Sequence, residues 1–126
     1  MDRQIINVGA RVAGAPYSHA VKVGNFVFAA GQIGVDPETG KLVSGGIKAE
    51  TRRTLQNQAA VLKAGGSSLD RVLSTTVYLV DMASDYAGMN EVYKEFFPKD
   101  PPARATVEVK ALALGARVEI QLVAVI

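Results

Sequence analysis

The sequence predicts an α+β fold in one domain that spans residues 1–126. Three observations indicate this class: β-prone runs lie near both ends, two amphipathic helical patterns lie between them, and no repeat or linker divides the chain. The length suits one domain, and a hydrophobic fraction of 48% is enough to build a core. We therefore expect one β-sheet with two helices packed on one of its faces.

An N-terminal hairpin is predicted by two apolar, β-prone runs at residues 19–23 and 26–30. Gly24-Asn25 joins them, and this dipeptide suits a two-residue turn with positive φ at both positions. Another turn is expected at residues 36–40, where Pro37 fixes φ and Gly40 closes the turn.

Two amphipathic helices are predicted by apolar residues that recur every three to four positions. The first follows Gly45-Gly46 and ends at Gly65-Gly66, where a glycine can adopt the left-handed conformation. The second covers residues 84–97, and Pro98 ends it. The expected buried stripes are Ile47, Thr51, Leu55, Ala59 and Leu62 in the first helix, and Tyr86, Met89, Tyr93, Phe96 and Phe97 in the second.

Three further strands are expected at residues 71–80, 104–109 and 118–125. In the last strand, Val118, Ile120, Leu122 and Ala124 form one face, which we assign to the helices. The opposite face carries Glu119, Gln121, Val123 and Val125. Because two helices cover only one side of a sheet, the valines on the other side predict that another subunit covers it.

Composition excludes several classes of function. The fourteen Lys and Arg residues are interleaved with twelve Asp and Glu residues, which argues against nucleic-acid binding. The chain has no cysteine and one histidine, His19, so disulfides, cysteine nucleophiles and His-His metal sites are excluded. No apolar run reaches the length of a signal peptide or a membrane span, so a cytoplasmic location is expected.

A few residues could carry chemistry, and each has a structural alternative. Gly31-Gln32-Ile33-Gly34 either lets a strand end bend or exposes backbone N–H groups to an anion. Arg104 follows Pro101-Pro102-Ala103 and is either a surface arginine or a bidentate partner for a carboxylate. Glu119 is either part of a strand-face salt bridge, with Arg104 or Lys110, or a shielded general base.

Three other polar residues are considered for a role in chemistry. His19, at a strand start, is interpreted as structural or exposed. Tyr17, in a loop after Pro16, either packs or contacts a ligand. Asn90 lies next to Met89 and could sit at the border of the buried face of its helix.

Seven short motifs occur together along the whole chain, and together they are far more specific than any one of them. They are Pro16-Tyr17-Ser18, Gly31-Gln32-Ile33-Gly34, Leu42-Val43-Ser44-Gly45-Gly46, Thr75-Thr76-Val77, Asn90-Glu91-Val92-Tyr93, Pro102-Ala103-Arg104-Ala105 and Arg117-Val118-Glu119-Ile120. In this order they closely resemble the RidA (YjgF) family of enamine/imine deaminases.

The resemblance implies a chorismate-mutase-like fold with a mixed β-sheet, assembled as a homotrimer with clefts between subunits. It also implies hydrolysis of reactive 2-imino acids, such as the imine formed from 2-aminoacrylate, to a 2-keto acid and ammonia. No cofactor or metal is implied. An iminium carbon is already electrophilic, so the protein has only to position it, balance its carboxylate and direct a water molecule.

The resemblance also assigns roles to individual residues. Arg104 matches the arginine that binds the substrate carboxylate, and Glu119 matches the acid that orients and deprotonates the water. Tyr17 and Asn90 match residues that line the cleft, and Gly31 matches a backbone hydrogen-bond donor. The chain departs from many relatives at Ala30, where they carry Ser or Thr, so a hydroxyl contact to the substrate is lost.

Two other functions remain open from the sequence. A small-acid-binding regulatory module would use the same cleft without turnover. Ribonuclease or translation-inhibitor activity is attached to some members of the family, but the chain shows no basic stripe with stacking aromatic residues.

Overall fold

A six-stranded β-sheet and two α-helices make up the computed structural model, which describes residues 2–126. The strands are β1 (Gln4–Ile6), β2 (Ala20–Val23), β3 (Phe26–Gln32), β4 (Val72–Leu79), β5 (Ala103–Glu108) and β6 (Val118–Val125). The helices are α1 (Gly46–Ala64) and α2 (Met82–Phe96), with short 3-10 helices η1 (Val12–Gly14), η2 (Leu69–Arg71) and η3 (Ala113–Gly115). The expected strands and helices are confirmed, and β1 is an additional edge strand that the sequence pattern did not indicate.

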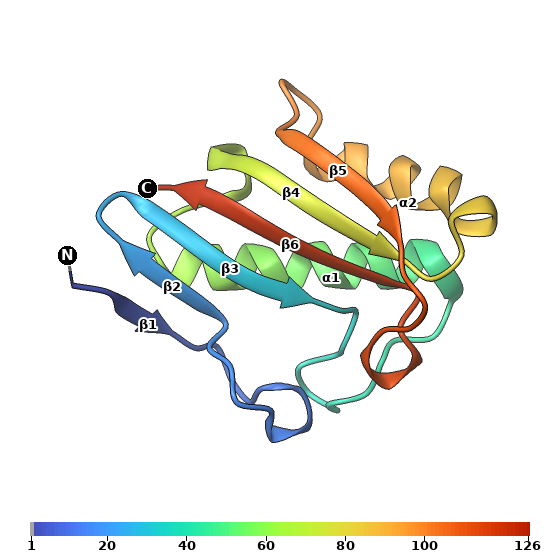
Figure 1. Cartoon of the computed structure of the whole chain (residues 1–126), viewed down its shortest axis with the longest axis horizontal. Helices are drawn as coiled ribbons and strands as arrows, with labels where there is room; N and C mark the ends of the chain where they lie inside the picture. The colour runs from blue at the N-terminus through green and yellow to red at the C-terminus, as the bar shows by residue number, and fades with distance from the viewer. Residues whose placement is uncertain (1) are drawn as a thin grey trace.

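The strand order in the sheet is β1-β2-β3-β6-β4-β5 (Figure 1). Strands β4 and β5 are parallel because α2 carries the chain back to the same end of the sheet, whereas the other neighbours are antiparallel. The predicted mixed sheet is therefore confirmed. The C-terminal strand β6 lies in the middle, between β3 and β4, so it is shielded on both edges.

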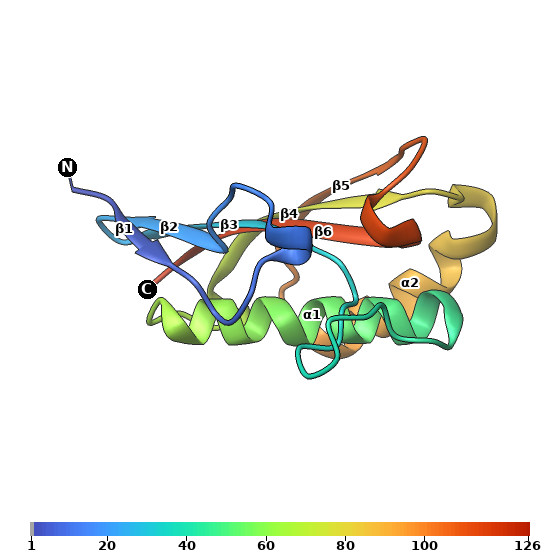
Figure 2. The same cartoon turned by 90° about the horizontal axis from the view of Figure 1, so that it is seen from below.

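Both helices lie on the same side of the sheet (Figure 2), as the sequence predicts. The residues of β6 assigned to the helices, which are Val118, Ile120, Leu122 and Ala124, are at most 2% exposed. They pack with apolar residues of α1 and α2 in one core cluster. Neither helix of the described chain is both long and apolar enough to cross a bilayer.

The β2–β3 turn and the start of α2 differ in detail from expectation. In the β2–β3 turn only Gly24 has positive φ, so the turn is of the type that needs glycine at its first central position alone. Helix α1 ends as expected, with Gly66 in the left-handed conformation. Helix α2 begins at Met82, earlier than expected, because the Asp81 side chain accepts a hydrogen bond from the Ser84 N–H at 3.1 Å and caps the first turn.

One position in the predicted buried stripes is wrong, because Tyr86 is 42% exposed. Ile47, Ala59 and Phe96 are half-buried, and Ile47 and Phe96 pack against the core cluster. The fully buried residue beside Ala59 on α1 is Gln58, whose amide nitrogen donates hydrogen bonds to the carbonyl oxygens of Ala30 at 2.9 Å and Ile120 at 2.7 Å. Gln58 therefore bridges β3 and β6 from below the sheet, where the register between those strands shifts.

The face of the sheet opposite the helices is largely apolar and exposed. Strand pairing aligns Phe26 with Val125 and Phe28 with Val123 on this face. The exposed hydrophobic side chains there are Ile5, Phe26, Phe28, Leu73 and Val107, each between 41% and 48% accessible. A row of this kind is typical of a surface that another protein subunit covers.

Candidate active site

A cavity of about 360 Å³ lies at the end of β3, beside η1 and η3. Nine residues line it: Val12, Ala15, Tyr17, Ala30, Gly31, Gln32, Ile33, Ala113 and Glu119. A volume of this order is enough for a small metabolite. Because most of its walls are apolar, the acid group of Glu119 is the chemically reactive feature of the cavity.

The Glu119 carboxylate is half-buried on the open face of β6. Burial raises the pKa of this carboxyl above its usual range, because leaving water disfavours the charged form. None of the ion pairs formed within residues 2–126 includes Glu119, so the predicted salt bridge with Arg104 or Lys110 is absent from the described chain. A carboxylate in this state is a suitable proton acceptor for a bound water molecule.

Gly31 lies directly against this carboxylate. A Cβ atom added at Gly31 would lie 2.7 Å from Glu119 Cδ, far inside van der Waals contact. The other glycine of the motif, Gly34, packs in the same way against α1, because a Cβ atom there would lie 2.9 Å from the backbone oxygen of Glu50. Both glycines are therefore needed for close approach, and the strand also bends here, because the β3–β6 register shifts between Ala29 and Gln32.

Substituting Gly31 with alanine is expected to displace the Glu119 side chain while leaving the fold intact, since φ at Gly31 is not in the left-handed region. A shift of about 1 Å in a catalytic group lowers kcat by roughly 100-fold. Steady-state kinetics would measure this loss. Adding Gly31→Ala to Glu119→Gln should cost little more, because the displaced group is already inactive. Two fully additive losses would show that Gly31 acts independently of Glu119.

Tyr17 and His19 shape the wall formed by the N-terminal loop. The Tyr17 hydroxyl accepts a hydrogen bond from the Val12 N–H at 3.0 Å, which holds η1 over the cavity. His19 is buried, and its Nδ1 accepts the Val8 N–H at 2.8 Å. Burial, with the nearby Arg11 charge, lowers the pKa of His19. The structural interpretation of His19 is confirmed, while Tyr17 both packs and lines the cavity.

Arg104 lies on the other side of the sheet from Glu119. In the β4–β5 register it pairs with the buried Thr75, on the face that carries the helices, whereas Glu119 pairs with Tyr78 on the open face. The Arg104 side chain borders a separate shallow cavity with Met82, Ala83, Tyr86, Ala87 and Thr106. Within one chain, therefore, the guanidinium does not face the Glu119 cavity.

The predicted site residues thus fall into two groups. Tyr17, Gly31 and Glu119 come together around one cavity, whereas Arg104 borders another. Asn90, which is half-buried on α2, lines neither of these two cavities. No three His, Asp or Glu side chains among residues 2–126 cluster closely enough to hold a metal ion.

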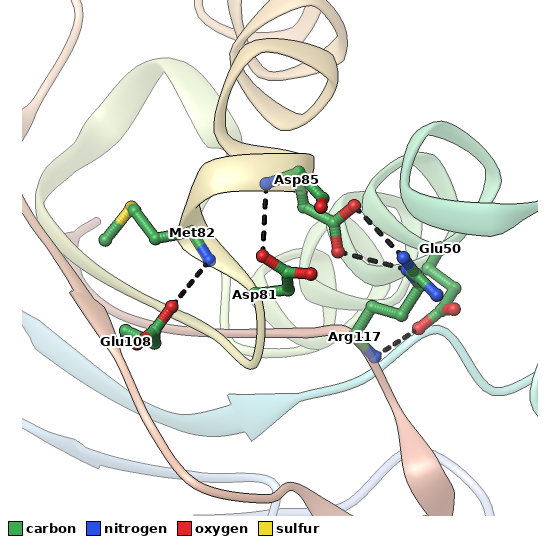
Figure 3. A network of polar contacts seen from close by, with 7 residues as sticks. Glu50, Asp81, Met82, Asp85, Glu108 and Arg117 are labelled. Carbon is green, nitrogen blue, oxygen red and sulfur yellow. Dashed lines mark hydrogen bonds and ion pairs between the residues drawn. The ribbon is translucent and has the colours of Figure 1, made fainter.

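A polar network that the sequence did not reveal fixes the start of β6, just before Glu119 (Figure 3). The Arg117 guanidinium donates hydrogen bonds to both carboxylate oxygens of Asp85, at 3.0 and 3.3 Å. The backbone N–H of Arg117 donates to Glu50 Oε1 at 2.8 Å. Burial raises the pKa of Glu50. These contacts tie β6 to both helices and so set the position of the strand that carries Glu119. The sequence offered one signal for this network, which is an acidic residue within each predicted helix, Glu50 in the first and Asp85 in the second.

Curated relatives align over most of the chain. A RutC family protein of Pyrococcus abyssi is 50% identical over 109 residues, which cover 86% of this chain and 85% of the relative. The human protein named 2-iminobutanoate/2-iminopropanoate deaminase is 44% identical over 125 residues, covering 98% of this chain and 90% of the relative.

Solved structures agree with the fold. RidA from an Antarctic Psychrobacter species superposes with a TM-score of 0.91 at 43% identity, covering 98% of this chain and 99% of that one. TdcF of E. coli, solved with bound serine, gives 0.90 at 35% identity, covering 98% of each chain. The Endoribonuclease L-PSP family model matches residues 9–126. On these similarities, and with a sheet and helix arrangement shared by the solved relatives, the chain belongs to the RidA (YjgF) family.

Proposed function

We propose that the chain hydrolyses 2-imino acids, formed from enamines such as 2-aminoacrylate, to 2-keto acids and ammonia. The observation that carries this proposal is the half-buried Glu119 carboxylate, unpaired within the described residues and facing a small, mostly apolar cavity. Support comes from relatives at 42–45% identity that are named as deaminases of this type.

Glu119 is the base and then the acid of the proposed reaction. The substrate reacts as its iminium form, C=NH2+. Glu119 accepts a proton as a water oxygen bonds to the iminium carbon, and the C=N π electrons neutralise the nitrogen. The same carboxyl then gives its proton to the amino nitrogen of the tetrahedral intermediate. As the C–N bond breaks and ammonia leaves, the remaining hydroxyl gives its proton back to the Glu119 carboxylate, and the keto acid forms. A raised pKa suits both transfers, because the group is neither too weak a base nor too weak an acid.

Arg104 enters the same site from a neighbouring copy of the chain in this proposal. One chain holds Glu119 and Arg104 on opposite faces of its sheet, so a shared site requires a second subunit. The apolar open face supports self-association, which we propose to be the homotrimer expected from the sequence. The serine bound in E. coli TdcF is a small carboxylate ligand of the kind that a guanidinium could bind. We further propose that the reaction takes place in the cytoplasm.

The proposal is tested by generating the enamine in place with a serine or threonine dehydratase and measuring keto acid and ammonia release. We expect the protein to accelerate release, and Glu119→Gln to lower kcat by about 100- to 10,000-fold. Activity should also fall as pH drops through the raised pKa of Glu119, because the protonated carboxyl cannot accept a proton from water. No acceleration by the wild-type protein would refute the proposed activity.

A regulatory binding module predicts a different outcome in the same experiment. It would bind 2-keto acids saturably without turnover, and Glu119→Gln would leave that affinity nearly unchanged. Endoribonuclease activity is favoured by the description of the matching family. RNA cleavage that survives Arg104→Ala in a highly purified sample would support that second candidate.

A further inference from the structure

The Arg104 guanidinium is held by neutral groups. The ion pairs within residues 2–126 are Lys48–Glu91, Arg52–Glu95 and Arg117–Asp85, and none involves Arg104. Instead, its Cζ lies 4.8 Å from the centre of the Tyr93 ring and 5.8 Å from that of Tyr86. Its Nη2 donates a hydrogen bond to the Tyr86 hydroxyl at 3.3 Å.

Tyr93 is the fixed part of this arrangement. It is 5% exposed, and its hydroxyl shares a 2.7 Å hydrogen bond with the Thr75 hydroxyl. Thr75 is the register partner of Arg104 on the neighbouring strand, so the ring is tied beside the point from which the arginine projects. The Phe97 ring packs on Tyr93 at 4.7 Å between centres. Tyr86, by contrast, is 42% exposed and forms the outer wall.

A neutral aromatic support has a chemical consequence. A carboxylate beside Arg104 would compete with an acidic ligand for the same N–H donors, whereas an aromatic face attracts the cation without using them. The groups that do accept from the guanidinium, the Tyr86 hydroxyl and the Met89 sulfur, are neutral and so compete less strongly than a carboxylate would. Ordering the long side chain before the ligand arrives also lowers the entropic cost of binding.

We propose that Tyr93 is a positioning residue that orients the Arg104 guanidinium toward the carboxylate of the substrate. This inference rests on the proposed function for the identity of the ligand. The contact between ring and guanidinium is the same before and during the reaction, so its loss should weaken substrate binding and leave the chemical step unchanged.

The test weakens the electrostatic attraction of the ring at position 93 for the Arg104 cation while keeping the shape of the ring nearly constant. Tyr93→Phe removes the hydroxyl but keeps the ring, and trifluorinated phenylalanine introduced at the same position weakens the attraction between ring and cation. We expect Tyr93→Phe to keep KM within about twofold, and the fluorinated variant to raise KM by roughly five- to thirtyfold with kcat unchanged. Thr75→Val, which loses the same hydrogen bond as Tyr93→Phe, is the matched control.

Binding of 2-oxobutanoate, measured by calorimetry, separates this inference from the proposed activity. If the wild-type protein binds the keto acid but does not accelerate hydrolysis of the imine, the proposed activity is wrong, but the fluorinated variant should still bind the keto acid more weakly than Tyr93→Phe. Equal affinity and equal KM in these two variants, with unchanged melting temperature, would overturn the role of Tyr93. So would a loss in kcat at constant KM.

Discussion

Replacing Arg104 with alanine is expected to abolish measurable acceleration of imine hydrolysis. The proposed role of the guanidinium is to pair with the substrate carboxylate, and truncating one partner of a shielded charge pair typically lowers kcat/KM on the order of 100- to 1000-fold. Folding should be preserved, because Arg104 is only half-buried and forms no ion pair with residues 2–126. The dehydratase-coupled assay gives the kinetics, and native mass spectrometry gives the assembly state.

Arg52→Ala is the matched control for this variant. The Arg52→Ala variant also loses a guanidinium. In the wild-type protein this guanidinium pairs with Glu95 on the exposed surface of α2, and neither residue lines either cavity. Arg52→Ala should retain wild-type kinetics. An Arg104→Ala protein with full activity would end the assignment of Arg104 to the site.

Gln58→Leu should destabilise the protein more than any surface substitution. The side-chain amide donates to two strand carbonyls where the β3–β6 register shifts, and leucine would remove both hydrogen bonds. Each such hydrogen bond contributes about 0.5–1.5 kcal/mol, so the free energy of unfolding should fall by roughly 1–3 kcal/mol. Urea denaturation at one fixed protein concentration measures the change, since assembly would make apparent stability depend on concentration.

Gln56→Leu separates this effect from the loss of a glutamine in general. Gln56 lies two positions earlier on α1 and is exposed, so its replacement should change the free energy of unfolding by less than about 0.5 kcal/mol. Equal unfolding midpoints for the two variants would show that the Gln58 hydrogen bonds contribute nothing measurable to stability.

The predictable part of the fold was the part that hydrophobic periodicity controls. The alternation in β6 assigns its two faces without ambiguity, because Val118, Ile120, Leu122 and Ala124 occupy every second position. Helix α1 is equally clear in extent, but its fully buried face includes Gln58 and not Ala59, because the Gln58 amide nitrogen donates two hydrogen bonds to strand carbonyls that periodicity alone does not reveal. Strand β1 is three residues long, too short for alternation to reveal it.

The candidate site was predictable only through motifs that occur together. Local sequence leaves Gly31, Arg104 and Glu119 with ordinary structural interpretations, because their meaning depends on what lies across the sheet. The contact of Gly31 with Glu119 requires the pairing of β3 with β6, which joins segments far apart in the sequence. The ring of Tyr93 had the periodicity of a core residue, and its contact with Arg104 follows only from the parallel pairing of β4 with β5.

The central claim is that Glu119 of one subunit and Arg104 of another form each site, and mixing two inactive variants tests it most directly. Arg104→Ala and Glu119→Gln chains, co-expressed in equal amounts, should form mixed assemblies in which some sites contain both intact residues. Random mixing across such an interface predicts about one quarter of the wild-type activity. If mixed assemblies form and remain as inactive as either parent, the two residues do not meet across subunits, and the account is contradicted.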